Sequence, residues 1–537
     1  YRKNYIQMSA LVTDQFRILN ASNFVNSVSN SSNSYYVFVG LSNATSPSGG
    51  FGRSSSWNTT PPNPTDNIDY LNHYDSTVLF GKKITSSNIR RVIRRINWVT
   101  GQKYDMYRPD YSVVNRSSTG SLRLYDANYY VMNSDYRVYI CIDNGSSGIN
   151  TTGNSSQVEP TFTDLEPSQL TDGYTWKYLY TVPPSDIIKF DSIDYIPLPN
   201  DWETSTDSQI SAVRDNGNST INENQIKKVF IKNTGSGYDT VTGKSCNLVG
   251  DGTGGKVSVD IDVNGKVSNI TVTSGGKNYT YALVDLGTTN ARQPSTFAEL
   301  IPIIPPSKGH GFDLYKELGA DKILIYARFD DSTKDFPIDT KFAQVGILKN
   351  PTIFDSSGIS TSVYTSNDFS GVYAMRFSGT PTGTISVGDK IEQSVSGGKA
   401  YGYVISYDSE TQVLKYYRDR SLYCGNGSGS AHADFVNSTS GISSYFNSTG
   451  YFYEFSSASG AAEVVKTGGG FNATIGSFTG IVTSISSKIV NLGVEFTNGL
   501  ATPEINNKSG EIIYIDNRPT VTRSSRQKED VKIILEF

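Results

Sequence analysis

Four arginines form the densest group of charge in the sequence: Arg90, Arg91, Arg94 and Arg95. The sequence predicts a short helix over residues 88–95, and side chains four positions apart lie on the same face of a helix. The two pairs at that spacing would form a basic stripe, which suits contact with an anion, a nucleic acid or an acidic neighbouring subunit. The alternative is a solvated helix face. Because the net charge is −4 and the flanks are not basic, no nucleic-acid partner is expected.

Nucleophilic catalysis usually needs a base, and histidine is scarce here, with 3 in 537 residues. They are His73, His310 and His432, and none belongs to a recognisable catalytic motif. No Gly-x-Ser-x-Gly elbow flanked by a strand and a helix is present. His310 has glycine on both sides and is interpreted as a residue of a loop. The sequence predicts no enzyme, although a triad is a spatial arrangement that spacing does not exclude.

Metal and phosphate sites have equally weak signals. Cys141, Cys246 and Cys424 are isolated, and no Cys-x-x-Cys pair occurs. Residues 250–255 are rich in glycine but lack the Lys-Ser/Thr pair of a phosphate-binding loop, so they are interpreted as a tight turn cluster. Asp251 in that cluster could join a carbonyl-lined cation site, but no calcium-loop pattern supports it. No cofactor and no metal is expected.

The composition describes a chain with little charge and many aromatic rings. Charged residues make up 18% and aromatic residues 12% of the chain, whereas typical domains have about 25% charged residues. The length of 537 residues suggests several domains. No apolar run is long enough to span a membrane and no secretory signal is visible, so no membrane partner is expected. This composition favours a binding or structural protein over an enzyme.

Strand signals dominate the elements that must position these residues. Residues 14–28 have apolar positions at helical spacing. Residues 35–40 read as a strand, and residues 174–182 as another with an aromatic side chain at every other position. Hairpins are predicted from residues 129–131 with 136–143, and from 401–407 with 412–417. The predicted fold is mainly β, with sandwich-like or barrel-like modules, a few short helices and several domains.

A weak internal repeat marks residues 226–300 as a separate β module. Residues 229–238 (VFIKNTGSGY) and 270–279 (ITVTSGGKNY) each combine an apolar strand, a glycine-containing turn and a tyrosine. At the C-terminal end, residues 511–515 and 531–537 read as strands. Asn517-Arg518-Pro519 between them is interpreted as a turn.

Several phrases in the sequence resemble a known family when they are taken together in order. They are Phe16-Arg17 with NFVNSV at 23–28, VFVG at 37–40, PPNPTDN at 61–67, RRINW at 94–98, YRVYICID at 136–143, DGYTWKYL at 172–179 with VPP at 182–184, KGHGFDLYKELGA at 308–320, FAQVGILKNP at 342–351, GEIIYIDNRP at 510–519 and VKIILEF at 531–537. In this order they resemble the baseplate wedge subunit of contractile-tailed, T-even-type bacteriophages, the wedge protein that forms a dimer.

The resemblance implies a wedge-protein framework that is interrupted by two β-rich insertions. Residues 226–300 and 379–500 have no counterpart in the shorter members of the family. The expected division is residues 1–225 and 301–378 as two parts of the framework, the two insertions, and residues 501–537 as strands that complete the framework.

The resemblance also implies a role and partners. The chain would be a non-enzymatic structural protein of the virion that links neighbouring wedge subunits in tail assembly and infection. It would form a homodimer, bind other baseplate wedge proteins and be assembled into the tail baseplate in the cytoplasm of a bacterial host. Candidate contacts with these partners are Arg90, Arg91, Arg94, Arg95 and Arg518.

Two other functions stay open. A tail adhesin would bind host glycans through the inserted β modules, using aromatic stacking surfaces at Tyr238, Tyr279, Tyr401 and Tyr403. Packing inside the modules is the alternative role of these rings. A polysaccharide hydrolase is the third function, because paired carboxylates need no histidine.

Overall fold

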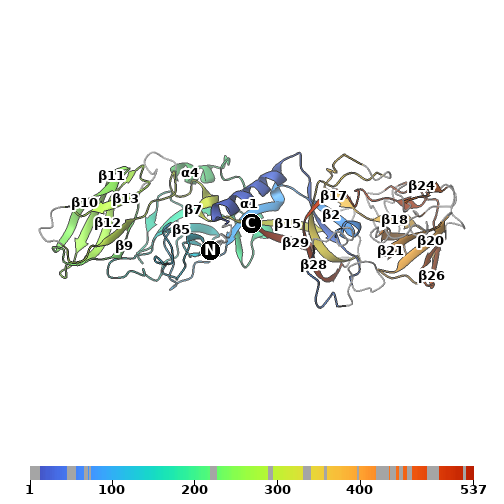
Figure 1. The fold of residues 1–537 in the computed structure, drawn as a ribbon, viewed down its shortest axis with the longest axis horizontal. Helices are drawn as coiled ribbons and strands as arrows, with labels where there is room; N and C mark the ends of the chain where they lie inside the picture. The colour runs from blue at the N-terminus through green and yellow to red at the C-terminus, as the bar shows by residue number, and fades with distance from the viewer. Residues whose placement is uncertain are drawn as a thin grey trace, which may run out of the picture. The chain divides into compact units, whose positions relative to one another are not determined.

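The computed structural model describes residues 12–537 apart from 45–55, 66–70, 72–73, 218–225, 288–293, 330–339, 356–359, 396–397, 419–434, 436–442, 447–451, 456–462, 481–494 and 524–527. Antiparallel strands dominate the described chain, and the helices are few and mostly short (Figure 1). The prediction of a mainly β, multidomain fold is confirmed.

The chain forms two compact units, and neither is made from one continuous stretch. Unit 1 contains the chain up to Val25, then Ile89–Leu324 and Ile533–Phe537, whereas unit 2 contains Asn26–Asn88 and Ile325–Lys532. The five-part division expected from the sequence stays a prediction, because these units follow other boundaries. The chain passes between units inside three elements, α1 (Asp14–Ser29), β15 (Lys322–Phe329) and β29 (Glu529–Glu536), and also after the 3-10 helix η1 (Ser86–Asn88).

A sheet of aromatic strands forms the centre of unit 1. The hairpin predicted from residues 129–131 and 136–143 is confirmed, because Tyr130 lies opposite Ile140. In the next strand of the sheet, Trp176 lies opposite Cys141. The sheet has the order β4 (Tyr130–Met132), β5 (Arg137–Asp143), β7 (Thr175–Thr181), β6 (Ser168–Gln169).

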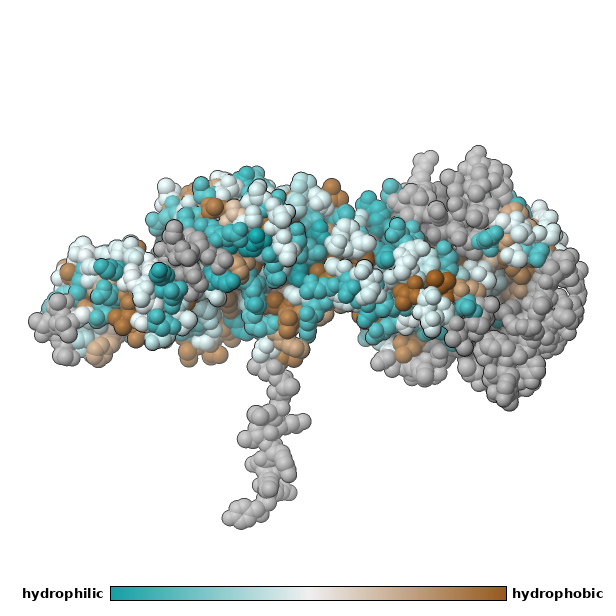
Figure 2. Space-filling model, turned by 90° about the horizontal axis from the view of Figure 1, so that it is seen from above, coloured by the Kyte–Doolittle hydropathy of each residue, from teal (hydrophilic) through white to brown (hydrophobic). Residues whose placement is uncertain are grey.

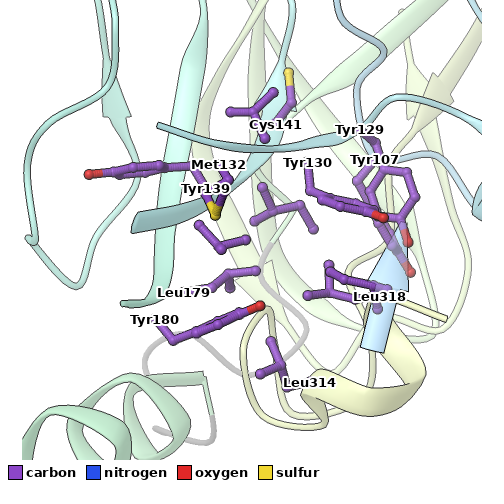
Figure 3. Packing of buried hydrophobic residues seen from close by; sticks show 14 of the residues in the cluster. Tyr107, Tyr129, Tyr130, Met132, Tyr139, Cys141, Leu179, Tyr180, Leu314 and Leu318 are labelled. Carbon is purple, nitrogen blue, oxygen red and sulfur yellow. The ribbon is translucent and has the colours of Figure 1, made fainter. Parts of the chain in front are cut away.

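Tyrosine rings fill the core around this sheet. Tyr174, just before β7, and Trp176 and Tyr178 within it are fully buried, and so is Leu179 on the opposite face of the strand. The Tyr174 and Trp176 rings stack, with 5.4 Å between centroids. Leu314 and Leu318 enter the same cluster of buried side chains as Tyr129, Tyr130 and Tyr180 (Figure 3). The tyrosines of this cluster therefore stabilise the interior and do not provide contact surface.

Shorter elements surround the central sheet of unit 1. One short helix begins at Pro184, which occupies its first turn, where the missing N–H is not needed. These elements are the strands β3 (Ile89–Arg94) and β8 (Tyr195–Pro197), which pair with each other, the helices α3 (Pro184–Phe190), α4 (Ser208–Gly217) and α5 (Leu314–Glu317), and the 3-10 helix η2 (Leu124–Asp126).

Residues 226–300 form separate sheets within unit 1. One has the order β12 (Val267–Lys277), β11 (Thr253–Ile261), β10 (Val241–Gly250), β13 (Ala282–Asp285), and β9 (Val229–Asn233) pairs with β14 (Glu299–Pro302). The two repeat copies thus lie in different sheets. Their tyrosines, Tyr238 and Tyr279, are nevertheless buried in one shared hydrophobic cluster.

Unit 2 contains a five-stranded sheet in which aromatic rings cover glycines. Phe38 lies opposite Gly81 on one side and Gly346 on the other, and Gly81 in turn lies opposite Phe369. A Cβ added at Gly81 would stand 2.1 Å from the Phe369 ring, so the close approach requires glycine there. The sheet has the order β17 (Asp368–Ser370), β2 (Val78–Ile84), β1 (Tyr35–Gly40), β16 (Lys341–Lys349), β28 (Glu511–Thr522).

The predicted turn at Asn517-Arg518-Pro519 is wrong, because β28 continues through all three residues. The register against β16 shifts at this place, so the strand accommodates the proline as an irregularity. Asn517 is buried and links two other segments. Its Oδ1 accepts a hydrogen bond from Gln344 Nε2 at 2.8 Å, and its Nδ2 donates to the Pro62 carbonyl at 2.7 Å.

A second, eight-stranded sheet occupies the rest of unit 2. The hairpin predicted from residues 401–407 and 412–417 is confirmed by the pairing of the strands Gly398–Asp408 and Val413–Tyr417. The order is β19 (Thr382–Gly383), β26 (Phe471–Thr474), β25 (Glu463–Lys466), β20 (Lys390–Val395), β21 (Gly398–Asp408), β22 (Val413–Tyr417), β18 (Tyr373–Arg376), β27 (Leu500–Ala501), and β23 (Ser443–Phe446) pairs separately with β24 (Phe452–Phe455).

The described surface is mainly hydrophilic on the face shown in Figure 2, and hydrophobic residues form small separate patches there. No helix in the described ranges is long and apolar enough to cross a membrane.

Asn517→Ala should destabilise unit 2. The substitution leaves the buried Gln344 amide and the Pro62 carbonyl without their partner, which should cost about 2–4 kcal/mol of unfolding free energy. Hydrogen exchange of the β16 amides, followed by mass spectrometry, measures the loss. Asn247→Ala, at an exposed strand position, is the matched control and should leave β16 unchanged. Equal exchange in the two variants would contradict the linking role.

Asp75→Asn should change how stability depends on pH. Burial raises the pKa of Asp75 from 3.8 to about 6 in the folded protein, against an opposing effect of Lys508. The folded state therefore holds this proton more tightly than the unfolded state. Its contribution to stability is present below about pH 4 and is lost as the pH rises to about 6, on the order of 2–3 kcal/mol in total.

Denaturation of both proteins between pH 4 and pH 7 tests this expectation. The Asn variant should be the more stable protein at pH 7 and should lack this part of the pH dependence. Asp239→Asn, at an exposed position, is the control. A wild type whose stability does not fall relative to the Asn variant over this range would refute the assignment.

Candidate functional site

Three of the four clustered arginines lie on the strand β3 and Arg95 directly follows it, so the predicted helix over residues 88–95 is wrong. β3 contains Ile89, Val92 and Ile93, which are buried, and it pairs with β8 through Val92 opposite Pro197. Branched apolar side chains fit a buried strand better than a helix. Because successive side chains of a strand point to opposite faces, the arginines do not form the expected stripe.

Arg90 and Arg91 hold unit 1 together from within. Arg90 donates from Nε and Nη2 to the two carboxylate oxygens of Asp186, at 2.8 and 3.0 Å. Arg91 lies over the ring of Tyr315, 4.0 Å from its centroid, and is only 4% exposed. Burial lowers the pKa of the Arg91 guanidinium. Arg91 therefore offers almost no surface to a partner.

Arg94 and Arg95 also contact their own unit. Arg95 Nη1 lies 2.5 Å from Asp191 Oδ1. Arg94 Nη2 donates to the carbonyls of Asp126 and Ala127, each at 3.1 Å, and to Asn128 Oδ1 at 2.9 Å. No acceptor of Arg94 is a carboxylate in the part of the chain that the structure describes. Its guanidinium therefore has no counter-ion among the described residues.

Arg518 is one of the exposed residues among the predicted contacts. Its side chain is 62% exposed and forms an ion pair with Asp516 at 2.8 Å. Its backbone carbonyl accepts a hydrogen bond from Trp57 Nε1 at 2.7 Å. Contact of these arginines with a partner stays a prediction.

Arg94 and Arg95 line a cavity of about 530 Å³ in unit 1, which we call the charged cavity. α1, β3, η2, the residues before β8 and the turn between α5 and β15 contribute to it. Its charged lining consists of five basic and five acidic residues: Arg17, Arg94, Arg95, Arg123, Lys322, Asp14, Asp126, Asp194, Asp321 and Glu536.

Ion pairs neutralise part of this lining. Arg123 contacts Asp126 at 3.0 Å and Asp14 at 3.4 Å, and its hydrogen bond to Asp126 raises the pKa of the guanidinium. Lys322 contacts Asp321 at 3.0 Å and Glu536 at 3.1 Å. These exposed or half-exposed pairs add little stability, but they fix the positions of both signs of charge around the cavity.

Tyr125 joins the wall of the cavity to its neighbours. Its hydroxyl donates to the Lys316 carbonyl at 2.8 Å and accepts from Gln15 at 3.0 Å. Burial raises the pKa of Tyr125 to about 12, so the hydroxyl stays neutral at physiological pH.

Arg17 is the one basic residue of the lining for which the described chain provides no hydrogen-bond acceptor or carboxylate. It lies in the first turns of α1, and its Nε is shielded from solvent. The sequence reasoning missed this residue, as it missed Arg123 and Lys322. These residues are far apart along the chain, and their individual positions carried no signal.

His310 lies in a turn, which confirms its interpretation as a loop residue, but its side chain is buried. Its Nδ1 is 2.5 Å from Glu317 Oε1, and the other oxygen of Glu317 accepts from the Gly311 N–H at 2.7 Å. The edge of the ring meets Tyr107, with 4.9 Å between centroids. Both oxygens of Glu317 are thus engaged, and the pair fixes the glycine-rich turn on α5. His73 and His432 lie outside the described residues.

Asp251 and Gly252 form the turn between β10 and β11, as predicted, whereas the other residues of the glycine-rich segment 250–255 belong to these two strands. Asp251 accepts hydrogen bonds from the backbone and side chain of Thr280, at 2.9 and 2.5 Å, and these bonds lower its pKa. Within the described ranges, no three His, Cys, Asp or Glu side chains are arranged to hold a metal ion.

Most of the tyrosines proposed as sugar-stacking surfaces are buried. Tyr238, Tyr279 and Tyr403 are 7%, 1% and 4% exposed. The Tyr279 hydroxyl donates to the Leu248 carbonyl at 3.0 Å, and the Tyr238 hydroxyl accepts from the Ala298 N–H at 2.8 Å. Tyr401 is half-buried, with Lys390 Nζ 3.9 Å from its ring centroid. The expected stacking surface is therefore wrong for three of the four residues.

No family model and no curated protein matches this chain.

Arg90→Met should destabilise unit 1 strongly. It leaves the buried carboxylate of Asp186 without its bidentate partner, and breaking such a pair from one side costs about 3–5 kcal/mol. Arg518→Met, at an exposed ion pair, should change stability by no more than about 0.5 kcal/mol. Thermal denaturation and hydrogen exchange of β3 compare the variants.

The double variant Arg90→Met/Asp186→Leu should recover part of the lost stability, because no buried charge is then left unpaired. Equal loss of stability in R90M and R518M would argue against the buried pair.

Proposed function

We propose that this chain is a structural subunit of the baseplate wedge of a contractile-tailed bacteriophage. It acts by contact with neighbouring wedge proteins and a second copy of itself, without catalysis. The observation that carries the proposal is the convergence in space of the sequence phrases that resemble the wedge protein.

In unit 2, three of these phrases meet at one residue. Asn517, in the phrase at 510–519, contacts Gln344 in the phrase at 342–351 and Pro62 in the phrase at 61–67. The same phrases provide β16 and β28, which pair along their length. Separate segments that resemble one family in order, and that also contact one another, favour a shared framework over chance likeness.

In unit 1, the phrases again form one substructure. The phrase at 136–143 provides β5, and the phrase at 172–179 provides most of the adjacent β7. Trp98 ends the phrase at 94–98. Its Nε1 donates a hydrogen bond to Ser156 Oγ at 3.0 Å, and its backbone N–H donates to the Met132 carbonyl at 2.9 Å. β4, which contains Met132, pairs with β5.

The two segments that lack a counterpart in the family form most of two other sheets. Residues 226–300 form the sheet of β10–β13, and residues 379–500 provide most of the eight-stranded sheet. Specific bonds attach the first of these to β5: Lys228 Nζ contacts Asp143 Oδ2 at 2.7 Å, and the Gly148 N–H donates to the Ser268 carbonyl at 2.9 Å. These added sheets enlarge the surface of the subunit and leave the strand pairing of the framework intact, which suits a subunit that contacts several neighbours.

The 537-residue chain should form a homodimer with about twice its 58.7 kDa mass. It should also form a complex with the other wedge proteins encoded in the same phage genome. Light scattering after size-exclusion chromatography measures the mass, and co-expression followed by affinity purification tests the complex. A monomer at micromolar concentration that retains no wedge protein would refute the proposed function.

A further inference from the structure

The charged cavity has basic groups whose charge no described residue neutralises. Arg17 has no carboxylate and no hydrogen-bond acceptor in the described chain, and its Nε is shielded from water. Arg94 binds only neutral oxygens. The described chain provides no acceptor for the terminal N–H groups of the Arg17 guanidinium either, so these donors can bind an acceptor that enters the cavity.

The rest of the lining limits what that acceptor can be. Five acidic side chains line the cavity beside five basic ones, so its overall charge does not attract a polyanion. Phosphate or nucleic acid would bring several negative charges close to Asp14, Asp126 and Asp194. One carboxylate satisfies a guanidinium and adds only one charge, and the planar donors of arginine match it well.

The lining also has an apolar contact beside its charges. Ile193, next to Asp194, is 91% exposed although it lines the cavity. A volume of about 530 Å³ falls in the range of roughly 300–1,000 Å³ typical of ligand sites. Together these features suit a short stretch of polypeptide with one acidic side chain.

We propose that the charged cavity receives one Asp or Glu side chain from an exposed segment of another protein, with Arg17 as its main partner. This inference rests on the proposed function only in expecting that protein to be a neighbouring wedge subunit.

Capped peptides test the inference on the full-length protein. The probes are acetyl-Ala-Glu-Ala-amide, its Gln analogue, and acetyl-Ala-Ala-Ala with a free C-terminal carboxylate, each measured by ligand-observed NMR with inorganic phosphate as competitor. We expect the Glu peptide to bind about 10-fold or more tightly than the Gln analogue, because a hydrogen bond to a charged group is lost in the latter.

The variants identify the partner. Arg17→Gln should weaken the Glu peptide about 10-fold and leave the Gln analogue unchanged, whereas Arg328→Gln, at an exposed ion pair in unit 2, should bind as the wild type does. Hydrogen exchange of α1 checks that Arg17→Gln keeps its fold.

Three results would overturn the proposal: equal binding of the Glu and Gln peptides, an R17Q variant that binds the Glu peptide as tightly as the wild type, or tighter binding of phosphate or of the free C-terminal carboxylate. None of these measurements depends on dimer or wedge assembly. Failure of the proposed function and failure of the carboxylate site are therefore distinguishable.

Discussion

The discontinuity of both units is the constraint on which the rest of the structure depends. The chain changes unit four times, so the central sheet of unit 2 must combine β1 and β2 from the first hundred residues with β16 and β28 from much later ones. Contacts of this sequence separation cost loop-closure entropy before they contribute any energy. Each unit therefore needs specific long-range interactions to select the correct strand neighbours.

Ring–glycine contacts and buried polar hydrogen bonds select the strand neighbours in unit 2. The row of Phe369, Gly81, Phe38 and Gly346 joins four strands of unit 2 through rings that fit only over residues without a side chain. A register shift of one residue would place these rings on the other face of the sheet. Asn517 adds a polar restraint, since its amide satisfies a side chain and a backbone carbonyl at once. Buried polar groups of this kind penalise any alternative pairing that leaves them unsatisfied.

The arginines on and next to β3 contact groups of their own unit. Arg90 and Arg95 are engaged with aspartates, and Arg91 is covered by Tyr315. A cluster that looks like an exposed basic patch in the sequence is thus largely internal structure. The charged cavity differs, because Arg17 and Arg94 keep charges that the described chain does not neutralise. This contrast, and not the number of arginines, distinguishes a candidate binding site from a structural ion pair.

The sequence by itself determined the local elements and the fold class. Apolar spacing located α1, β-branched and aromatic runs located β1, β5 and β7, and glycine-rich segments located turns, because each of these signals acts over a few neighbouring residues. The strand at residues 89–94 was mistaken for a helix because the arginine spacing hid its buried Ile89, Val92 and Ile93.

Only the tertiary structure decided what those residues do. Pro519 reads as a turn until pairing with β16 carries β28 through it. Tyr238 and Tyr279 read as exposed stacking rings until one shared core buries them. The charged cavity is assembled from α1, β3, η2 and the turn before β15, which are separated by up to three hundred residues. Burial and the choice of ionic partner depend on distances through space, and no local pattern in the sequence encodes them.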